Sequence, residues 1–269
     1  MPHSARERAR QNETHMIYSD LNSIQTKREL PMNEATKFLG LEDTFHFSCH
    51  PGIDCFTQCC QDVNILLTPY DIIQMKNGLG ISSTEFLEKY TKTLLAPETS
   101  LPAVQFKMDE ENEKKCYFVG EKGCGIREQR PWSCRMYPMD ANEAGTEFKP
   151  LVDSTRCLGL KDDTVWHLRD WFEDQGLPPY NEWNQLFAEL TEDEKLTRWR
   201  KEYPGAADIF YLACYDLDRF REQVFKEKLY EMVDQSSVDQ DALKTDDLAL
   251  MQFAFTWLKT VAEREIENK

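Results

Sequence analysis

Cysteines are the residues of this chain that are best suited to chemistry. Eight of the nine fall between positions 49 and 157, and the ninth, Cys214, stands apart from them. Thiolates bind zinc and iron well, and four of them complete either a tetrahedral zinc site or the ligand shell of a four-iron cluster. The clustered thiols, all candidate metal ligands, are Cys49, Cys55, Cys59, Cys60, Cys116, Cys124, Cys134 and Cys157.

The spacing of these thiols bears on the choice of metal. No C-x2-C pair, the usual element of structural zinc ribbons, occurs among them. The two cysteine-bearing loops are rich in Gly, Pro and aromatic residues, which can exclude water and offer backbone N–H groups to sulfur. Both features favour an iron–sulfur cluster of the 4Fe-4S type over zinc, and zinc stays open as the alternative.

Adjacent Cys59 and Cys60 complicate a single site with four ligands. Successive side chains diverge in extended backbone. The two thiols can therefore serve different sites, or one of them can be redox-active. Eight thiols also suffice for two sites, and the spacing alone does not indicate which four would share an ion.

Two histidines and the ninth cysteine have weaker claims to a role. His46 and His50 flank Cys49, and a place beside the ligands or in solvent is favoured for each over direct ligation. Cys214 lies in an apolar helical stretch, where we expect a small buried core residue.

Three arginines are interleaved with the second group of cysteines and are candidates for cofactor binding. One interpretation is a positive rim that steadies an anionic thiolate cluster, or that binds a carboxylate or phosphate. The other is a set of ion pairs with the many acidic residues of the chain. These arginines are Arg127, Arg130 and Arg135.

Composition excludes several functional classes. The 269 residues carry a net charge of −16, which opposes binding to nucleic acid or to an anionic membrane surface. No run of 18 apolar residues occurs, and the N-terminal MPHSARERARQNETHM is charged, so we expect neither a membrane span nor a signal peptide. The expected compartment is the cytoplasm, where clustered cysteines more often serve metals or redox chemistry than disulfides.

The elements that would position the thiols indicate an α+β fold. We expect a polar arm at residues 1–30, a small cysteine-rich metal-binding domain of short strands and helices at residues 31–160, and a helical C-terminal half at residues 161–269 that buttresses it. After the first cysteine loop, Thr68 caps a predicted helix that ends at Asn77-Gly78. Ser82 or Ser83 then opens a second predicted helix, whose apolar face runs from Phe86 to Leu95.

Periodicity predicts the remaining elements. Val104, Phe106 and Met108 alternate as in a half-buried strand, with Cys116–Val119 as its expected partner. Pro131 and Pro138 should keep the segment around them irregular. A further strand is expected at Phe148–Val152, and further helices at Asn33–Leu39, Val165–Phe172, Asn181–Leu190, Ile209–Val233 and Leu248–Ala262.

The pattern resembles a known family from about Cys49 to Gly159. The matching segments are FTQCC, LTPYDI, CYFV, CGI, RPWSCRMYP and CLG. They are similar to those of the CxxCxxCC family of zinc- or iron-chelating domains, also called YkgJ-type cysteine-cluster proteins. The gaps in the first loop are five and three residues, rather than the two that the family name implies. The resemblance implies metal-ligand roles for Cys55, Cys59, Cys60, Cys116, Cys124 and Cys134, and extends them to Cys49 and Cys157.

Three functions follow as hypotheses. The first is a metalloprotein with an iron–sulfur cluster or zinc and an electron-transfer or accessory role toward a redox partner. The second rests on the flagellin lysine N-methylases of the family. It would require S-adenosylmethionine and a protein substrate, but no Gly-rich loop follows a strand in a βαβ pattern here. The third is a structural zinc protein whose helical half binds a partner. The sequence leaves the oligomeric state open.

Overall fold

A computed structural model describes residues 38–97, 99–142 and 145–267, and the chain divides into two compact units that alternate along the sequence. Unit 1 comprises the described residues up to Ile65 together with those of Lys107–Gln185. Unit 2 comprises Leu66–Phe106 together with the chain from Leu186 onward. The units thus divide the chain at three points. The predicted arm at residues 1–30 and most of the predicted Asn33–Leu39 helix lie outside the described residues.

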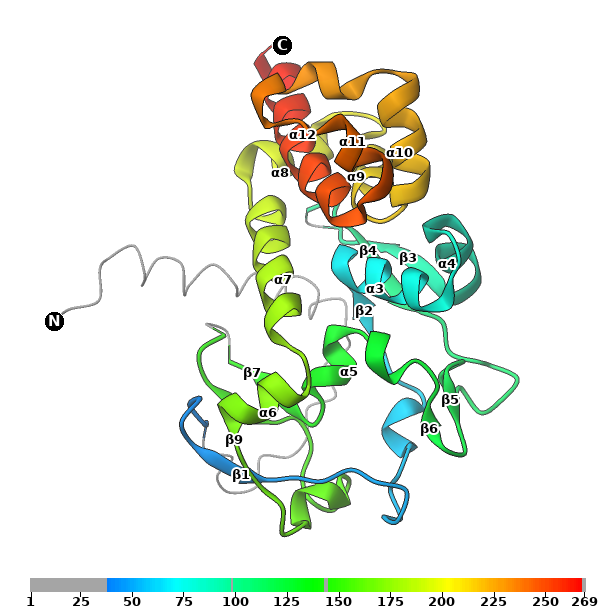
Figure 1. Ribbon diagram of the computed structural model, residues 1–269, viewed down its shortest axis with the longest axis vertical. Coiled ribbons are helices and arrows are strands. Elements are labelled where there is room, and N and C mark those ends of the chain that lie inside the picture. The colour runs from blue at the N-terminus through cyan, green and yellow to red at the C-terminus, as the bar shows by residue number, and fades with distance from the viewer. Residues whose placement is uncertain (1–37, 98, 143–144, 268–269) are drawn as a thin grey trace, which may run out of the picture. The chain divides into compact units, whose positions relative to one another are not determined.

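Unit 1 consists of two-stranded ribbons, short helices and loops (Figure 1). All of its ribbons are antiparallel, and each strand has only two or three residues. The ribbons are β1 (Thr44–His46) with β9 (Val165–His167), β5 (Val119–Gly120) with β6 (Gly123–Cys124), and β7 (Met139–Ala141) with β8 (Phe148–Pro150). The helical turns are η1 (Gln58–Cys60), η2 (Arg127–Gln129), α5 (Trp132–Met136), η3 (Leu158–Lys161) and α6 (Leu168–Asp174).

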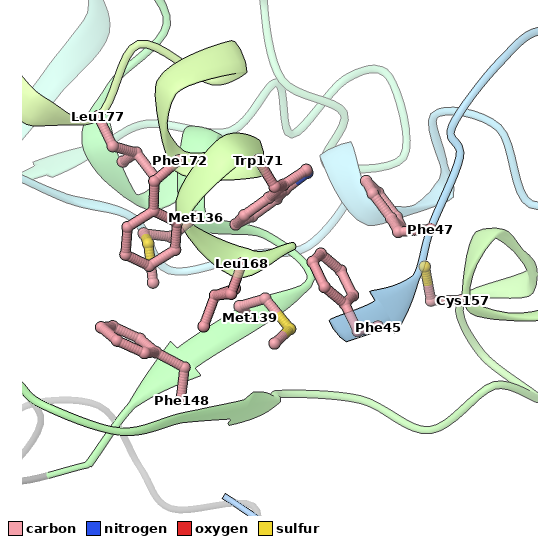
Figure 2. Close-up of a cluster of buried hydrophobic side chains, with 10 residues drawn as sticks. All are labelled: Phe45, Phe47, Met136, Met139, Phe148, Cys157, Leu168, Trp171, Phe172 and Leu177. Atoms are coloured by element: carbon pink, nitrogen blue, oxygen red, sulfur yellow. The ribbon is translucent and has the colours of Figure 1, made fainter. Parts of the chain in front are cut away.

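Large apolar side chains form the core of unit 1 (Figure 2). Trp171 of α6 meets the rings of Phe45 and Phe47 edge-on, at centroid distances of 5.4 and 6.0 Å. Phe148 of β8 meets Phe172 in the same way at 4.8 Å. The cluster also contains Met136, Met139, Cys157, Leu168 and Leu177.

Unit 2 combines a small sheet with packed helices (Figure 1). Its strands lie in the order β2 (Leu66–Leu67), β4 (Pro102–Phe106), β3 (Thr91–Leu95), and all pairings are antiparallel. The first helices are α3 (Pro69–Leu79) and α4 (Ser83–Tyr90). The later ones are α8 (Glu194–Glu202), α9 (Ala206–Cys214), α10 (Leu217–Lys226), η4 (Leu229–Met232), η5 (Gln235–Ser237), α11 (Gln240–Thr245) and α12 (Asp247–Glu267). The division at Gln185 falls inside α7 (Pro178–Thr191).

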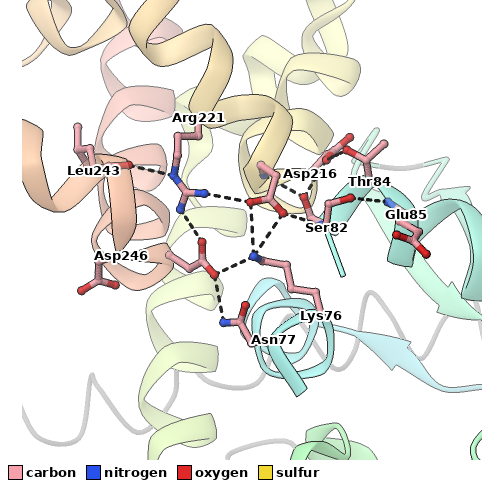
Figure 3. Close-up of polar contacts among 12 residues, drawn as sticks. Lys76, Asn77, Ser82, Thr84, Glu85, Asp216, Arg221, Leu243 and Asp246 are labelled. Carbon is pink, nitrogen blue, oxygen red and sulfur yellow. Dashed lines mark hydrogen bonds and ion pairs between the residues drawn. The ribbon is translucent and has the colours of Figure 1, made fainter. Parts of the chain in front are cut away.

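A network of ion pairs around the buried Lys76 joins the helices of unit 2 (Figure 3). Lys76 of α3 is 7% exposed, and its ammonium lies 3.3 Å from Asp218 of α10 and 2.9 Å from Asp247 of α12. Arg221 of α10 pairs with the same two carboxylates at 3.0 and 2.5 Å. Burial of Asp247 opposes its ionisation, but hydrogen bonds from Arg221 and Lys76 prevail and lower its pKa. The network therefore links three helices that are far apart in sequence.

The α+β class and the helical second half are confirmed, and the predicted start of α3 is correct in detail. Thr68 and Asp71 form a reciprocal capping box at its N-terminus. The helix continues through Asn77-Gly78, however, and ends before Gly80, which adopts φ 66°. Ser82 caps α4 as expected. Leu94 and Leu95 then belong to strand β3 rather than to the face of this helix.

Four other expectations are wrong. The strand at residues 102–106 is buried along its whole length and pairs with β2 and β3, whereas Val119 pairs with Cys124. The predicted helix at Val165–Phe172 begins as strand β9. The long helix at Ile209–Val233 is interrupted at Tyr215 and Asp216, between α9 and α10. The segment between the two prolines, expected to be irregular, contains the short helix α5.

Candidate metal centre

The first cysteine loop is a series of tight turns. Gln58 donates its backbone N–H to the carbonyl of Cys55, and Cys60 donates to Thr57, whose φ of 66° starts the 3₁₀ helix η1. Such turns bring residues that are close in sequence to adjacent points in space. Cys55, Cys59 and Cys60 are therefore all presented from one short coil of backbone.

The second loop is hydrogen-bonded to the first. Cys116 donates its N–H to the carbonyl of Cys60 at 2.8 Å. The β5–β6 hairpin that follows carries Cys124 and turns through Gly123, which has φ 101°. A Cβ on Gly123 would lie 3.0 Å from the Phe56 ring, so this glycine allows the hairpin to approach the first loop.

Cys157 reaches the first loop from a third segment. The N–H of Leu158 points at the sulfur of Cys55, with a nitrogen–sulfur distance of 3.3 Å. Ser48 donates its N–H to Gly159 at 3.1 Å, and a Cβ on Gly159 would stand only 2.5 Å from the Ser48 carbonyl oxygen. The backbones on either side of Cys49 and Cys157 are thus in direct contact.

Four thiols are neighbours at this junction. Cys49 is exposed by surface area, yet desolvation raises the pKa of its thiol to about 11, with further contributions from Cys59, Cys157 and Cys55. Desolvation likewise raises the pKa of Cys157, and Cys55 and Cys59 add to the shift. Backbone N–H groups of Leu160 and Gly159 point toward the Cys157 sulfur and oppose it.

A second group of thiols surrounds Cys60. A hydrogen bond between the two adjacent thiols lowers the pKa of Cys59 to about 7 and raises the pKa of Cys60. The Cys60 thiol also interacts with Cys134 and Cys116. Desolvation raises the pKa of Cys116, opposed by hydrogen bonds from the N–H groups of Phe118 and Val119, and Cys124 is its thiol neighbour.

Backbone N–H groups that point at cysteine sulfurs are a feature of metal-bound thiolates, because they stabilise negative charge on sulfur. Cys116 receives them from residues two and three positions later, and so does Cys157. Cys55 receives one from Leu158. The donor chemistry of these loops therefore suits zinc or iron.

The three arginines have different environments. Arg135 is buried, donates to the carbonyls of Glu128, Arg130 and Gln175, and lies over the Tyr180 ring. The guanidinium N–H groups of Arg135 thus bind backbone carbonyls and have a structural role. Arg127 is exposed and lowers the pKa of the Cys49 thiol.

Arg130 lies beside the second group of thiols. Desolvation lowers its pKa, as do Arg127 and Arg135, whereas the Cys134 and Cys124 thiols raise it. One of its terminal nitrogens donates to Gln175. Its Nε is buried and has no hydrogen-bond partner within the described part of the chain. A buried donor in this position calls for negative charge nearby.

The remaining candidates are two histidines and the ninth cysteine. His46 Nδ1 lies 3.1 Å from the carbonyl oxygen of Asp162, and His50 uses its Nδ1 to accept the N–H of Gly52. Cys214 is fully buried in α9, as expected of a core residue. Tyr137, whose ring suggested a packing role in the sequence, is a polar neighbour of the thiols: its hydroxyl hydrogen-bonds to Cys157, and its pKa is raised by desolvation and by Cys157 and Cys59. The sequence signal for this contact is that Tyr137 lies three positions after Cys134, in the segment CRMYP.

The cysteine side chains of the described residues do not form a complete metal site. Across residues 38–97, 99–142 and 145–267, no three His, Cys, Asp or Glu side chains already stand in an arrangement that would hold a metal ion.

Comparison with known proteins agrees with the donor chemistry. Residues 48–157 match the CxxCxxCC family model. The family is described as a "Putative zinc- or iron-chelating domain", and the match confirms the resemblance seen in the sequence. The CxxCxxCC domain contains all eight clustered cysteines and ends at Cys157. No curated protein and no solved structure matches the chain. None of the helices in the described ranges is long and apolar enough to cross a membrane.

Proposed function

We propose that the CxxCxxCC domain chelates zinc or iron through the thiolates of its eight clustered cysteines, and that the metal is needed to hold the cysteine loops in place. The observation that carries this proposal is the lack of a core in these loops. No residue in the stretches 48–66 and 107–125, both fully described, is buried. Such stretches gain little from the hydrophobic effect, which is the usual source of folding free energy.

Metal binding supplies that free energy in small thiolate domains. Structural zinc contributes about 10–16 kcal/mol to the folding of zinc-finger peptides. Here the loops are ordered by backbone hydrogen bonds such as Cys116 N–H to Cys60 and Gly125 N–H to Phe118. Six of the eight thiols are partly exposed rather than buried in a hydrophobic core. Metal ligation accounts for both facts.

The more specific form of the proposal is an iron–sulfur cluster of the 4Fe-4S type with an electron-transfer or accessory role. Its support is the absence of C-x2-C pairs in the sequence and the N–H groups directed at Cys55, Cys116 and Cys157. Zinc remains the alternative, since it accepts the same donors. The lysine N-methylase hypothesis stays a prediction that rests on the family resemblance.

Metal content and absorption of anaerobically purified protein test the proposal. Iron with an equal amount of sulfide and a broad band near roughly 400 nm supports the cluster. Zinc without colour supports chelation but rejects the cluster. Protein that contains neither metal, and that cannot be loaded with zinc or iron under reducing conditions, would reject metal chelation altogether.

A further inference from the structure

The segment around Cys134 carries positive charge that no carboxylate of the described residues neutralises. The sequence leaves two uses open for Arg127, Arg130 and Arg135, either a positive rim at the metal centre or ion pairs with acidic residues. None of the three forms an ion pair within the described part of the chain, although the protein has 48 acidic residues for 32 lysines and arginines. The arginines that form ion pairs there are Arg169, Arg198 and Arg221. The structure therefore favours the positive rim.

The Arg130 side chain is held on one side by a chain of hydrogen bonds. Its Nη2 donates to Gln175 Oε1 at 2.5 Å, and Gln175 Nε2 donates to Asp174 at 2.8 Å. The carbonyl of Arg130 accepts the Nε–H of Arg135 at 2.9 Å. The guanidinium thus has a defined place, in which its own Nε–H is buried and has no partner among the described residues. A buried charged donor without an acceptor is unfavourable.

The neighbouring arginines increase the need for negative charge at this point. Burial lowers the pKa of Arg130, and the like charges of Arg127 and Arg135 lower it further. The Cys134 and Cys124 thiols oppose this shift. Because none of these arginines pairs with a carboxylate in the described ranges, the cysteines are the neighbouring groups that can supply a negative charge.

The backbone keeps Arg130 close to one of the candidate ligands. Cys134 and Arg135 both donate their N–H groups to the carbonyl of Pro131, at 3.0 and 3.1 Å, at the start of α5. Arg130 is the residue immediately before Pro131. The guanidinium and the Cys134 thiol are therefore carried by neighbouring turns of one short segment.

We propose that Arg130 is a positioning residue of the metal centre, whose guanidinium offsets the negative charge of the metal–thiolate group and donates its Nε–H to a sulfur of the second cysteine loop. This inference rests on the proposed function and adds a residue other than cysteine to the site. Zinc with four thiolates carries a net charge of about −2, and a charge of that size in a protein needs compensation. A thiolate is also a suitable acceptor for a guanidinium N–H.

The first experiment measures the zinc affinity of the full-length protein by competition with a chelator under reducing conditions. Arg130→Gln removes the charge and Arg130→Lys keeps it. Arg169→Gln is the control, because Arg169 is exposed and paired with Glu42. Loss of a group that hydrogen-bonds to a metal ligand typically lowers metal affinity by about 10- to 100-fold. We expect a loss in that range for Arg130→Gln, recovery of most of the affinity in Arg130→Lys, and no change in the control.

Two outcomes of this experiment would overturn the proposal while leaving chelation intact. One is an Arg130→Gln variant that binds zinc as tightly as the unmodified protein. The other is an equal loss in the Gln and Lys variants, which would mean that Arg130 serves the fold through its bond to Gln175 rather than the metal through its charge.

The second experiment follows the unmodified protein and so does not depend on the folding of a variant that lacks the charge. Proton–nitrogen NMR records the Nε–H signal of Arg130, which is identified by its absence from the spectrum of Arg130→Lys. Zinc should shift this signal and slow the exchange of its proton with water, whereas the Nε–H signal of Arg169 should not respond. Zinc bound without a response at Arg130 would overturn this proposal alone.

Inorganic phosphate distinguishes a role at the metal centre from a site for a free oxyanion. If phosphate added without metal shifts the Arg130 signal as zinc does, the segment binds oxyanions and the proposal is overturned. No response to phosphate, together with the response to zinc, supports it. A chain that binds no metal would overturn both this proposal and the proposed function.

Discussion

Unit 2 buries the side chains that hold it together, whereas two stretches of the cysteine loops of unit 1, residues 48–66 and 107–125, bury none. In unit 2, β4 is buried along its length, and aromatic rings such as Phe187 and Phe210, or Phe220 and Trp257, are in contact. In unit 1, a cluster of buried apolar side chains lies around Trp171. The stretches 48–66 and 107–125 lie outside that cluster.

The difference shows that one chain uses two sources of stability. Helices and a small sheet suffice where apolar periodicity can supply a core. Loops with closely spaced cysteines, glycines and prolines have no such periodicity, and they depend on backbone hydrogen bonds and on ligation. The two parts should therefore respond differently to metal removal and to substitution.

Metal removal should give the largest effect and should be confined to unit 1. A chelator that strips the reduced protein should expose the amides of Cys116 and Gly125 to rapid hydrogen exchange, because ligation contributes on the order of 10 kcal/mol in comparable sites. Amides of α10 and α12 should keep their protection. Hydrogen exchange read by mass spectrometry tests this, and equal loss of protection in both units would contradict the comparison.

Lys76→Met should cause the largest effect of a single substitution in unit 2. It leaves Asp218 and Asp247 with Arg221 as their remaining cation, and breaking a buried pair costs about 3 kcal/mol. Denaturant unfolding measures the loss. Lys195→Met, which removes the exposed pair with Glu263, is the matched control and should change stability little.

The same network predicts an acid response. Because the pKa of Asp247 is lowered in the folded state, its contribution to stability is present at neutral pH and is lost as the pH falls through that lowered pKa. Asp247→Asn should therefore lessen the fall in unit 2 stability at acid pH. An unchanged acid dependence in this variant would mean that other carboxylates dominate.

Gly159→Ala should have an intermediate effect, localised in unit 1. The added Cβ would approach the Ser48 carbonyl oxygen to 2.5 Å, and overpacking of this kind costs about 2 kcal/mol. Because the clash separates the backbones next to Cys49 and Cys157, metal affinity should fall as well. Gly120→Ala is the control, since nothing lies within 4 Å of its Cβ. Equal behaviour of the two variants would argue against a tight contact at Gly159.

Local signals in the sequence predicted local structure well. Thr68 was predicted as the cap and start of α3 from its own side chain and the following proline, and the structure adds the reciprocal capping box with Asp71. The apolar period of α12 is correct because its buried positions repeat along one helix. The clustering of the cysteines was likewise visible as spacing, although their grouping was not, because it depends on how three distant segments meet.

Contacts between residues far apart in the sequence were not predicted correctly. β4 pairs with a strand on each side, Leu66–Leu67 and Thr91–Leu95. All five of its residues are therefore buried, whereas the alternation of apolar residues predicted a strand with one exposed face. The break between α9 and α10 has a similar origin. Asp216 accepts hydrogen bonds from the hydroxyls of Ser83 and Thr84 at the start of α4. This contact joins residues more than 130 positions apart, so no local sequence pattern predicts it.

Thr68→Ala should have the smallest of these effects, and it should be confined to unit 2. The substitution removes the hydroxyl that accepts the Asp71 N–H, and loss of such a cap costs about 1 kcal/mol. Thr68→Ser keeps the hydroxyl and should retain most of the stability. Denaturant unfolding gives the magnitude, and zinc content gives the location. Because Thr68 caps the N-terminus of a helix in unit 2, the metal content should not change. A loss of metal in parallel with the loss of stability would show that the two units do not rely on separate sources of stability.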